Sequence, residues 1–208
     1  MAQYFTIHPE TPQARLLQQA VAILRDGGVI ALPTDSCYAL ACHTGDKEAM
    51  ETLRRIRDVD DRHHLTLMCR DLSAIGQYAR VDNACYRLLK AATPGSYTFI
   101  LEGTKELPRR LLHPKRKTIG LRIPDHPVAL ALLDALGEPL LTSTLILPGQ
   151  ELPLTDGWEI REQLEHDLDL ILDGGHCGPE PTTVIDLTGP QPEVLRLGRG
   201  PLAPLGLN

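Results

Sequence analysis

A polar tetrapeptide that suits a binding site, Pro33-Thr34-Asp35-Ser36, directly follows the apolar run Val29–Leu32. The apolar run predicts a buried strand, and the residues Tyr38–Cys42 predict a second strand that leaves the turn. Ligands of α/β proteins bind beyond the carboxyl ends of strands, where hydroxyl and carboxylate oxygens can exchange hydrogen bonds with them. The alternatives for Asp35 are a turn residue that bonds its own backbone and an acid that faces a metal.

A second polar segment is Thr118–Pro127, which begins with a predicted strand over Thr118–Arg122. Strand alternation places Thr118, Gly120 and Arg122 on one side of that strand. An arginine at a strand end can hold a carboxylate or a phosphate through two parallel hydrogen bonds. The alternative for Arg122 is a surface ion pair with Asp125.

Both segments resemble motifs of a known family. Pro33–Leu40 resembles the PTDT-Y-G-L signature of the YrdC/YciO family, the threonylcarbamoyl-adenylate synthases and their RNA-binding relatives, and Thr118–Pro127 resembles its T-V-A-V-R-x-P-x-H-P motif. Thr182–Asp186 resembles the family's S-T-V-V-D strand, and Leu195–Gly198 resembles its L-R-x-G close. The resemblance extends from about Thr11 to Gly198, in the pattern of the YciO branch.

The resemblance implies a fold and a chemistry. The implied fold is α/β, a single YrdC-like domain over residues 11–198, with a twisted mixed sheet and a concave basic cavity flanked by helices. The implied nucleotidyltransferase activity joins L-threonine, bicarbonate and ATP into L-threonylcarbamoyladenylate, which feeds the threonylcarbamoyladenosine modification of tRNA. ATP with Mg²⁺ would enter as a substrate, and no protein-bound metal is expected.

The resemblance also assigns roles to individual residues. Arg122 would take the threonine carboxylate, and Arg57 would be catalytic. The hydroxyl groups expected to line the amino-acid pocket belong to Thr34, Thr144 and Thr182. The residues expected to face the nucleotide are Thr118 and Arg196.

Four positions depart from the family motifs. Arg57–Met68 aligns with K-G-R-P-x-D-N-P-L-x-x-H, and Thr144–Ile146 aligns with S-A-N. The replacements are Val59 for arginine, His63 for asparagine, Met68 for histidine and Ile146 for asparagine. An apolar side chain cannot donate a hydrogen bond to a phosphate, so we expect weak synthesis. Two alternatives remain open: hydrolysis of preformed threonylcarbamoyl-adenylate with His63 or His64 positioning water, and a non-catalytic RNA-binding or ribosome-assembly role.

Charge is distributed unevenly along the chain. The net charge is −6, yet Lys105–Arg122 holds seven basic residues and one acid. We expect this segment to line the concavity and to contact phosphates of double-stranded RNA or tRNA, and the alternative is a solvated loop. The residues predicted to bind RNA are Lys105, Arg109, Arg110, Lys115, Arg116 and Lys117.

The elements that must position these residues follow from periodicity and capping signals. A length of 208 residues suits one domain. Five cysteines without a CxxC pair favour reduced thiols, and no run approaches the about 20 apolar residues of a membrane span, so we expect a cytoplasmic protein without a membrane partner. Further strands are predicted over Gln3–Ile7, Leu65–Cys69, Tyr97–Leu101, Leu140–Ser143, Leu168–Leu172, Thr183–Leu187 and Val194–Leu197. Helices are predicted from Pro12, capped by Thr11, to the Gly27-Gly28 pair, and over Asp46–Arg57, Asp71–Tyr78, Asp82–Ala91, Pro127–Leu136 and Gly157–Leu164.

Overall fold

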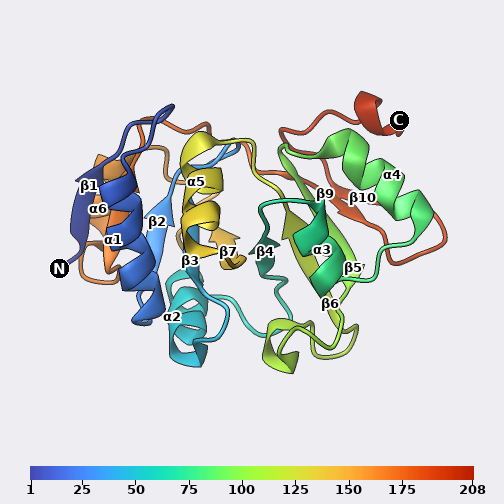
Figure 1. Cartoon of the computed structure of the whole chain (residues 1–208), viewed down its shortest axis with the longest axis horizontal. Helices are drawn as coiled ribbons and strands as arrows, with labels where there is room; N and C mark the ends of the chain where they lie inside the picture. Colours follow the sequence, from blue (N-terminus) through green and yellow to red (C-terminus); the bar gives the residue numbers. More distant parts are fainter.

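Ten strands pair into one mixed sheet in the computed structural model, which describes all 208 residues (Figure 1). Their order is β1-β8-β2-β3-β7-β4-β6-β5-β9-β10. The sheet contains parallel pairs such as β5 with β9 and antiparallel pairs such as β5 with β6, so the predicted mixed α/β sheet is confirmed. The bounds are β1 Gln3–Thr6, β2 Ile30–Leu32, β3 Ala39–His43, β4 Thr66–Met68, β5 Tyr97–Glu102, β6 Thr118–Arg122, β7 Leu140–Thr144, β8 Leu170–Asp173, β9 Thr183–Asp186 and β10 Glu193–Arg196.

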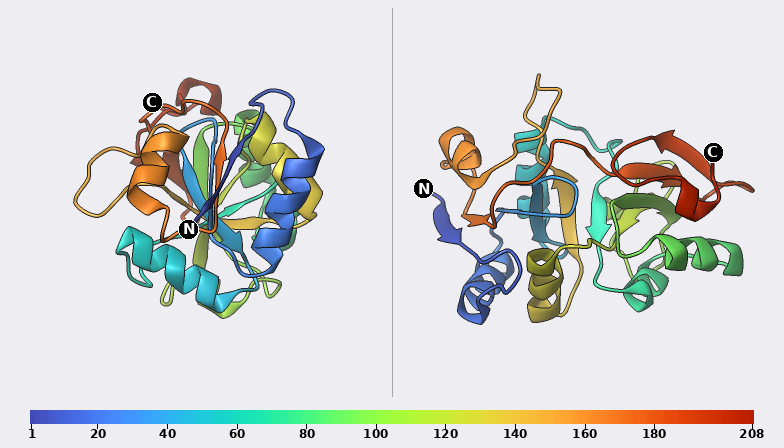
Figure 2. Two further views of the ribbon diagram at one scale, coloured as in Figure 1. Left: turned by 90° about the vertical axis from the view of Figure 1, so that its left-hand side faces the viewer. Right: turned by 90° about the horizontal axis from the view of Figure 1, so that it is seen from above.

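Helices cover both sides of the sheet. Figure 2 shows α1, α5, α3 and α4 along one side and α2 and α6 on the other. The helices are α1 Ala14–Arg25, α2 Lys47–Arg57, α3 Leu72–Tyr78, α4 Asn83–Ala92, α5 Pro127–Leu136 and α6 Gly157–Leu164, with short 3-10 helices at Arg109–Leu111 and Ala203–Leu205. None of these helices has the length and apolar character that crossing a bilayer demands.

Aspartate caps begin several helices as their sequence positions indicate. The Asp71 and Asp82 carboxylates accept the backbone N–H groups of Ala74 and Cys85, as predicted. Asp46 does the same for α2, at the start of the helix that ends with Arg57.

The predicted start of the first helix is wrong. The helix begins at Ala14 with Gln13 as its N-cap, rather than after Thr11. The Nδ1 atom of His8 accepts the backbone N–H of Thr11 at 3.0 Å, and the Gln13 side chain accepts the N–H of His8 at 2.9 Å. These bonds make a turn around His8, and this turn holds Thr11 and Pro12 outside the helix.

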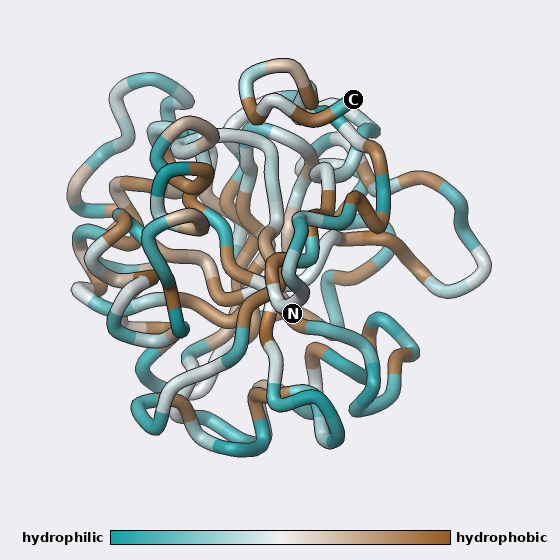
Figure 3. Tube along the Cα trace, turned by 90° about the vertical axis from the view of Figure 1, so that its right-hand side faces the viewer, coloured by the Kyte–Doolittle hydropathy of each residue, from teal (hydrophilic) through white to brown (hydrophobic).

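The hydrophobic core lies on the two faces of the sheet. Figure 3 shows hydrophobic segments through the centre of the trace and hydrophilic ones in the outer loops. One cluster joins Leu24 of α1 and Leu132 of α5 to strand residues such as Met68, and the other includes Leu53 of α2 and Phe99 of β5. The sheet begins with β1, before residue 11, and the tail after residue 198 returns to the core, where Tyr97 donates its hydroxyl to the carbonyl oxygen of Pro201 at 2.6 Å.

Candidate functional site

A cavity of about 340 Å³ opens over β4, β5 and β9, with α2 at one wall. Alternating strand positions supply its floor, because Thr66, Thr98 and Val184 point to the same face of the sheet. Other walls come from the end of β7, the loop after α2 and the edge strand β10. The lining residues are Arg57, Arg62, His63, His64, Thr66, Thr98, Ile100, Ser143, Thr144, Ile146, Thr182, Val184, Leu195 and Arg196.

The cavity is positively charged. Its lining holds three arginines and two histidines, and it contains no carboxylate. The Nη1 atom of Arg57, at the end of α2, donates to the Ser143 hydroxyl at 2.8 Å and to the Thr144 carbonyl oxygen. Arg196 on β10 donates from Nε at 3.1 Å and from Nη2 at 2.8 Å to the carbonyl oxygen of Thr182. Arg57 and Arg196, held by these bonds in a lining without carboxylates, suit an anionic ligand.

A small inner chamber of about 20 Å³ adjoins the cavity and shares several lining residues with it, among them Thr98, Ser143 and Thr182. Arg122 is the charged residue of its lining, which is otherwise mostly hydroxyl-bearing. Gly120 leaves room between the walls, because a Cβ atom there would lie 3.0 Å from Thr98 Cγ2 and 3.1 Å from Thr66 Oγ1. The predicted alternation of Thr118, Gly120 and Arg122 thus directs β6 toward the site.

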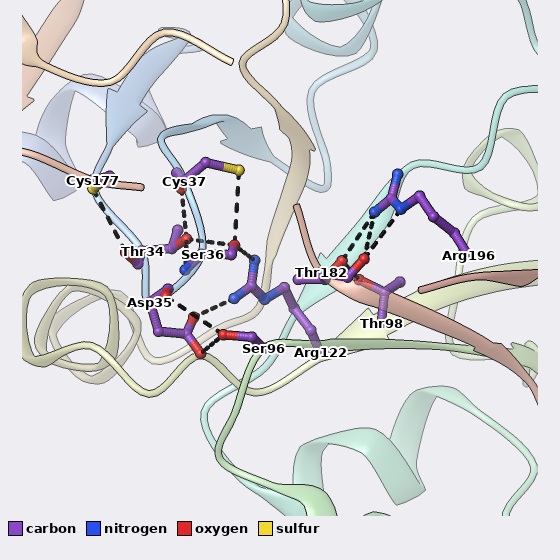
Figure 4. A network of polar contacts seen from close by, with 10 residues as sticks. All are labelled: Thr34, Asp35, Ser36, Cys37, Ser96, Thr98, Arg122, Cys177, Thr182 and Arg196. Atoms are coloured by element: carbon purple, nitrogen blue, oxygen red, sulfur yellow. Dashed lines mark hydrogen bonds and ion pairs between the residues drawn. The ribbon is translucent and has the colours of Figure 1, made fainter. Parts of the chain in front are cut away.

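Arg122 and Asp35 form a buried ion pair behind this chamber (Figure 4), with side-chain exposures of 7% and 10%. Asp35 also accepts the Ser96 hydroxyl at 3.0 Å, and Arg122 Nη1 donates to Ser36 Oγ at 3.3 Å. The carboxylate of Asp35 does not bond its own backbone, as one interpretation had it, but is the counter-ion of an arginine on β6. The alternative ion pair of Arg122 with Asp125 is wrong for the same reason.

Four of the residues predicted for the site line the cavity. They are Thr144, Thr182, Arg57 and Arg196. Thr182 binds Thr98 hydroxyl to hydroxyl at 2.8 Å, which fixes one side of the opening into the chamber.

Two predicted residues lie one layer behind the walls. Thr34 is buried and donates its hydroxyl to the carbonyl oxygen of Cys37 at 2.6 Å, so it shapes the turn at Asp35. Thr118 is buried too, and its hydroxyl lies 2.7 Å from Nε2 of the cavity residue His64. Both therefore touch residues of the site without lining either hollow.

The predicted position of the basic segment is wrong for most of its length. None of Lys105, Arg109, Lys115, Arg116 and Lys117 lines the cavity, and Arg110, which does not line it either, donates to the carbonyl oxygen of Thr44 at 2.8 Å. The chain between β5 and β6 is a surface loop over residues 103–117 with the 3-10 helix Arg109–Leu111 near its middle. Its contact with the site is His113, whose ring stacks on His64 with centroids 5.1 Å apart.

The four positions that depart from the family motifs lie in three different places in the structure. Ile146 and His63 line the cavity, whereas Val59 lines an adjacent open hollow with Asp58 and Asp60. Met68 is fully buried in the core beside α1 and α5 and faces no ligand.

Sequence reasoning missed Arg62, Thr66, Thr98 and Ser143 as cavity residues. Alternation along the predicted strands gives a usable signal for Thr66 and Thr98. Arg62 lies in a loop, where no periodicity indicates the direction of a side chain.

His63 is expected to be neutral at pH 7. Partial burial at the cavity mouth, and then the charges of Arg57 and Arg54, lower the pKa of His63 to about 4. An unfolded chain binds this proton near the ordinary pKa of about 6.5, so the folded state loses stability as pH falls from there toward 4. We expect His63→Gln to lose less stability than the parent as pH falls through this range, as measured by urea unfolding. The difference should be modest, because the side chain is partly solvated. An NMR titration of His63 with an unshifted midpoint would contradict this expectation.

His64 behaves in a similar way. Burial, followed by the nearby His113 and Arg116, lowers the pKa of His64. Burial also lowers the pKa of the Arg57 and Arg196 guanidinium groups, although both remain charged at neutral pH.

Comparisons with known proteins agree with this fold. The Sua5/YciO/YrdC family model, described as telomere recombination, matches residues 22–198. YciO of Escherichia coli K12 is 58% identical over 204 residues, which covers 98% of this chain and 99% of that protein. The crystal structure of E. coli YciO superposes with a TM-score of 0.96 at 57% identity, over 99% of this chain and 100% of that one.

More distant relatives carry a functional name. Mouse threonylcarbamoyl-AMP synthase is 33% identical over 181 residues, which cover 84% of this chain and 63% of that enzyme. P. abyssi Sua5, crystallised with L-threonine, has the same fold, with a TM-score of 0.88 at 24% identity over 96% of this chain and 58% of that one.

Proposed function

The chain belongs to the Sua5/YciO/YrdC family, and from this premise we propose that its cavity binds L-threonine and an adenylate. In this proposal the protein slowly converts L-threonine, bicarbonate and ATP into L-threonylcarbamoyladenylate, pyrophosphate and water. The carboxylate of threonine reaches Arg122 at the inner chamber while the rest of the amino acid lies in the outer cavity, and the phosphate end of the nucleotide lies against Arg57 and Arg196.

The observation that carries this proposal is a hydroxyl-lined chamber that opens into an arginine-lined cavity without carboxylates. A buried hydroxyl that is matched to threonine's own hydroxyl favours threonine over analogues that lack it. Catalysis then consists mainly of positioning and of charge stabilisation at the α-phosphate. Mg²⁺ arrives bound to the nucleotide, because the cavity lining supplies no carboxylate to hold it.

An assay with two arms tests the proposal. The protein is incubated with ATP, L-threonine and bicarbonate in one arm and with preformed threonylcarbamoyl-adenylate in the other, and AMP and pyrophosphate are followed. Slow pyrophosphate release that requires threonine supports synthesis. Absence of turnover in both arms, together with absence of threonine binding by calorimetry, overturns the proposal.

Hydrolysis of preformed threonylcarbamoyl-adenylate is a second candidate, favoured by His63 at the cavity mouth. With its pKa lowered to about 4, the neutral imidazole can accept a hydrogen bond from water at pH 7. Release of AMP in the second arm that falls in His63→Gln would support this candidate.

RNA binding is proposed for the surface beside the cavity rather than for its interior. The exposed cations of the loop between β5 and β6 are Lys105, Arg109, Lys115, Arg116 and Lys117. The scarcity of aromatic residues, 4% of the chain, favours phosphate contacts to a duplex over base stacking.

The RNA proposal predicts a strong salt dependence. With about four phosphates engaged, affinity for duplex RNA or tRNA should fall about 100-fold between about 50 and about 200 mM salt. Joint replacement of Lys115, Arg116 and Lys117 by alanine should weaken binding at low salt and flatten this dependence, as measured by filter binding. The matched control replaces Arg15, Arg87 and Lys90, which are exposed on α1 and α4. Equal losses in the two triple variants would contradict a specific RNA surface.

A further inference from the structure

The buried pair of Asp35 with Arg122 divides the site into two electrostatic compartments. We propose that Asp35 is a positioning residue that holds the Arg122 guanidinium for a ligand carboxylate and makes the inner chamber neutral overall. The proposal deepens the function proposed above and rests on it.

The first step is the rigidity of the turn that carries Asp35. Thr34 Oγ1 accepts the backbone N–H of Ser36 at 3.2 Å and donates to the carbonyl oxygen of Cys37 at 2.6 Å. Ser96 donates to the Asp35 carboxylate from the start of β5, and its own carbonyl oxygen accepts the N–H of Thr183 at 3.1 Å. Asp35 is therefore held from two sides by parts of the sheet that do not depend on Arg122.

The second step concerns which N–H donors of the Arg122 guanidinium already have a hydrogen-bond acceptor. Asp35 takes Nη2 of Arg122 and Ser36 takes Nη1, while the buried Nε has no hydrogen-bond partner. A buried donor without a partner is unusual in a folded protein. The Nε atoms of Arg57 and Arg110 are unpartnered too, but Arg122 is the one of the three that lines the inner chamber, so its Nε–H is the donor left there for a ligand oxygen.

The third step is the difference in charge between the two hollows. Arg122 is compensated by Asp35, whereas Arg57 and Arg196 have no acid among the residues that line the cavity. A phosphate dianion gains more from the uncompensated arginines than from a neutral pair. A carboxylate that can use a fixed N–H and surrounding hydroxyls is favoured in the chamber, which gives the ligand one orientation.

The first experiment needs no ligand. The Nε–H of Arg122 is observed by NMR in the full chain and assigned from the signal that disappears in Arg122→Lys. We expect a signal protected from solvent exchange in the parent and its loss, or exchange at least about tenfold faster, in Asp35→Ala. An unchanged, protected signal in Asp35→Ala overturns the positioning role, whether or not the protein binds threonine.

The second experiment is a double-variant cycle on L-threonine binding, measured by calorimetry. Asp35→Ala should lower the affinity for L-threonine about 10- to 100-fold, because small misplacements of a binding group have effects of this size. In an Arg122→Ala background the same change should alter affinity less than about threefold, since Asp35 acts through Arg122. Independent, multiplying effects would overturn the proposal, and so would a parent-like affinity in Asp35→Ala.

Asp35→Asn tests the charge separation. The amide keeps an oxygen acceptor for Arg122 but removes the compensating charge. Inorganic phosphate should then compete with L-threonine in Asp35→Asn and not in the parent. Absence of competition in the variant overturns the neutral-chamber part of the proposal. If the parent binds no threonine while the NMR result stands, the proposed function fails and the positioning role of Asp35 remains.

Discussion

Replacing Arg122 with alanine is expected to reduce the affinity for L-threonine and for threonylcarbamoyl-adenylate at least about 100-fold. The change removes the charged donor of the inner chamber, and charge-assisted hydrogen bonds in a buried site are among the strongest polar contacts. It also leaves the Asp35 carboxylate buried without its partner, so the free energy of unfolding should fall by about 3–5 kcal/mol. Calorimetry measures the first effect, and urea unfolding measures the second.

Two further variants separate lost binding from lost folding. Arg122→Lys keeps the charge but not the planar fork, so it should retain much of the stability and little of the affinity. Arg70→Ala breaks an exposed ion pair with Asp134 of α5 and should cost at most about 1 kcal/mol with unchanged ligand binding. Threonine affinity that survives in folded Arg122→Ala would contradict the carboxylate role.

Replacing Ile146 with asparagine is expected to raise threonine-dependent pyrophosphate release from ATP about 10- to 100-fold. Ile146 lines the arginine-rich cavity, so an amide there supplies a hydrogen-bond donor beside the phosphates. A single donor placed at developing charge has effects of this size in other enzymes. The assay follows pyrophosphate with ATP, L-threonine and bicarbonate present, and with threonine omitted as the blank.

The companion change Val59→Arg should raise threonine-dependent pyrophosphate release less than Ile146→Asn does. Val59 faces the neighbouring hollow, where a new arginine would meet the carboxylates of Asp58 and Asp60. Ile146→Leu is the matched control, since it changes shape without adding a donor. A variant Ile146→Asn as slow as Ile146→Leu would mean that the missing amide is not the cause of slow synthesis.

The helices could be predicted well where their end signals are local. Pro127–Leu136 and Gly157–Leu164 have the predicted bounds. Pro127 starts the first of them, and Gly137 ends it in a left-handed conformation with φ of 74°. The helix starting at Ala14 was misplaced because its start depends on hydrogen bonds to His8, which lies outside the helical pattern.

The site could be predicted as a set of residues but not as a geometry. Motif order placed Thr182 and Arg196 in the cavity correctly. The partner of Asp35 lies 87 residues away, so no local pattern indicates the ion pair with Arg122. The basic run was misplaced because a run of charges gives no information on which way the loop that carries it turns.

The position of β10 at the border of the sheet ties ligand retention to local unfolding. Arg196 is carried by a strand whose one neighbour is β9, and its guanidinium reaches back to the residue just before β9. Border strands open at a lower free energy than central ones, so transient peeling of β10 would withdraw a cation from a bound phosphate. Occupancy should therefore slow amide hydrogen exchange in β10, and the escape rate of the ligand should follow the opening rate of this strand.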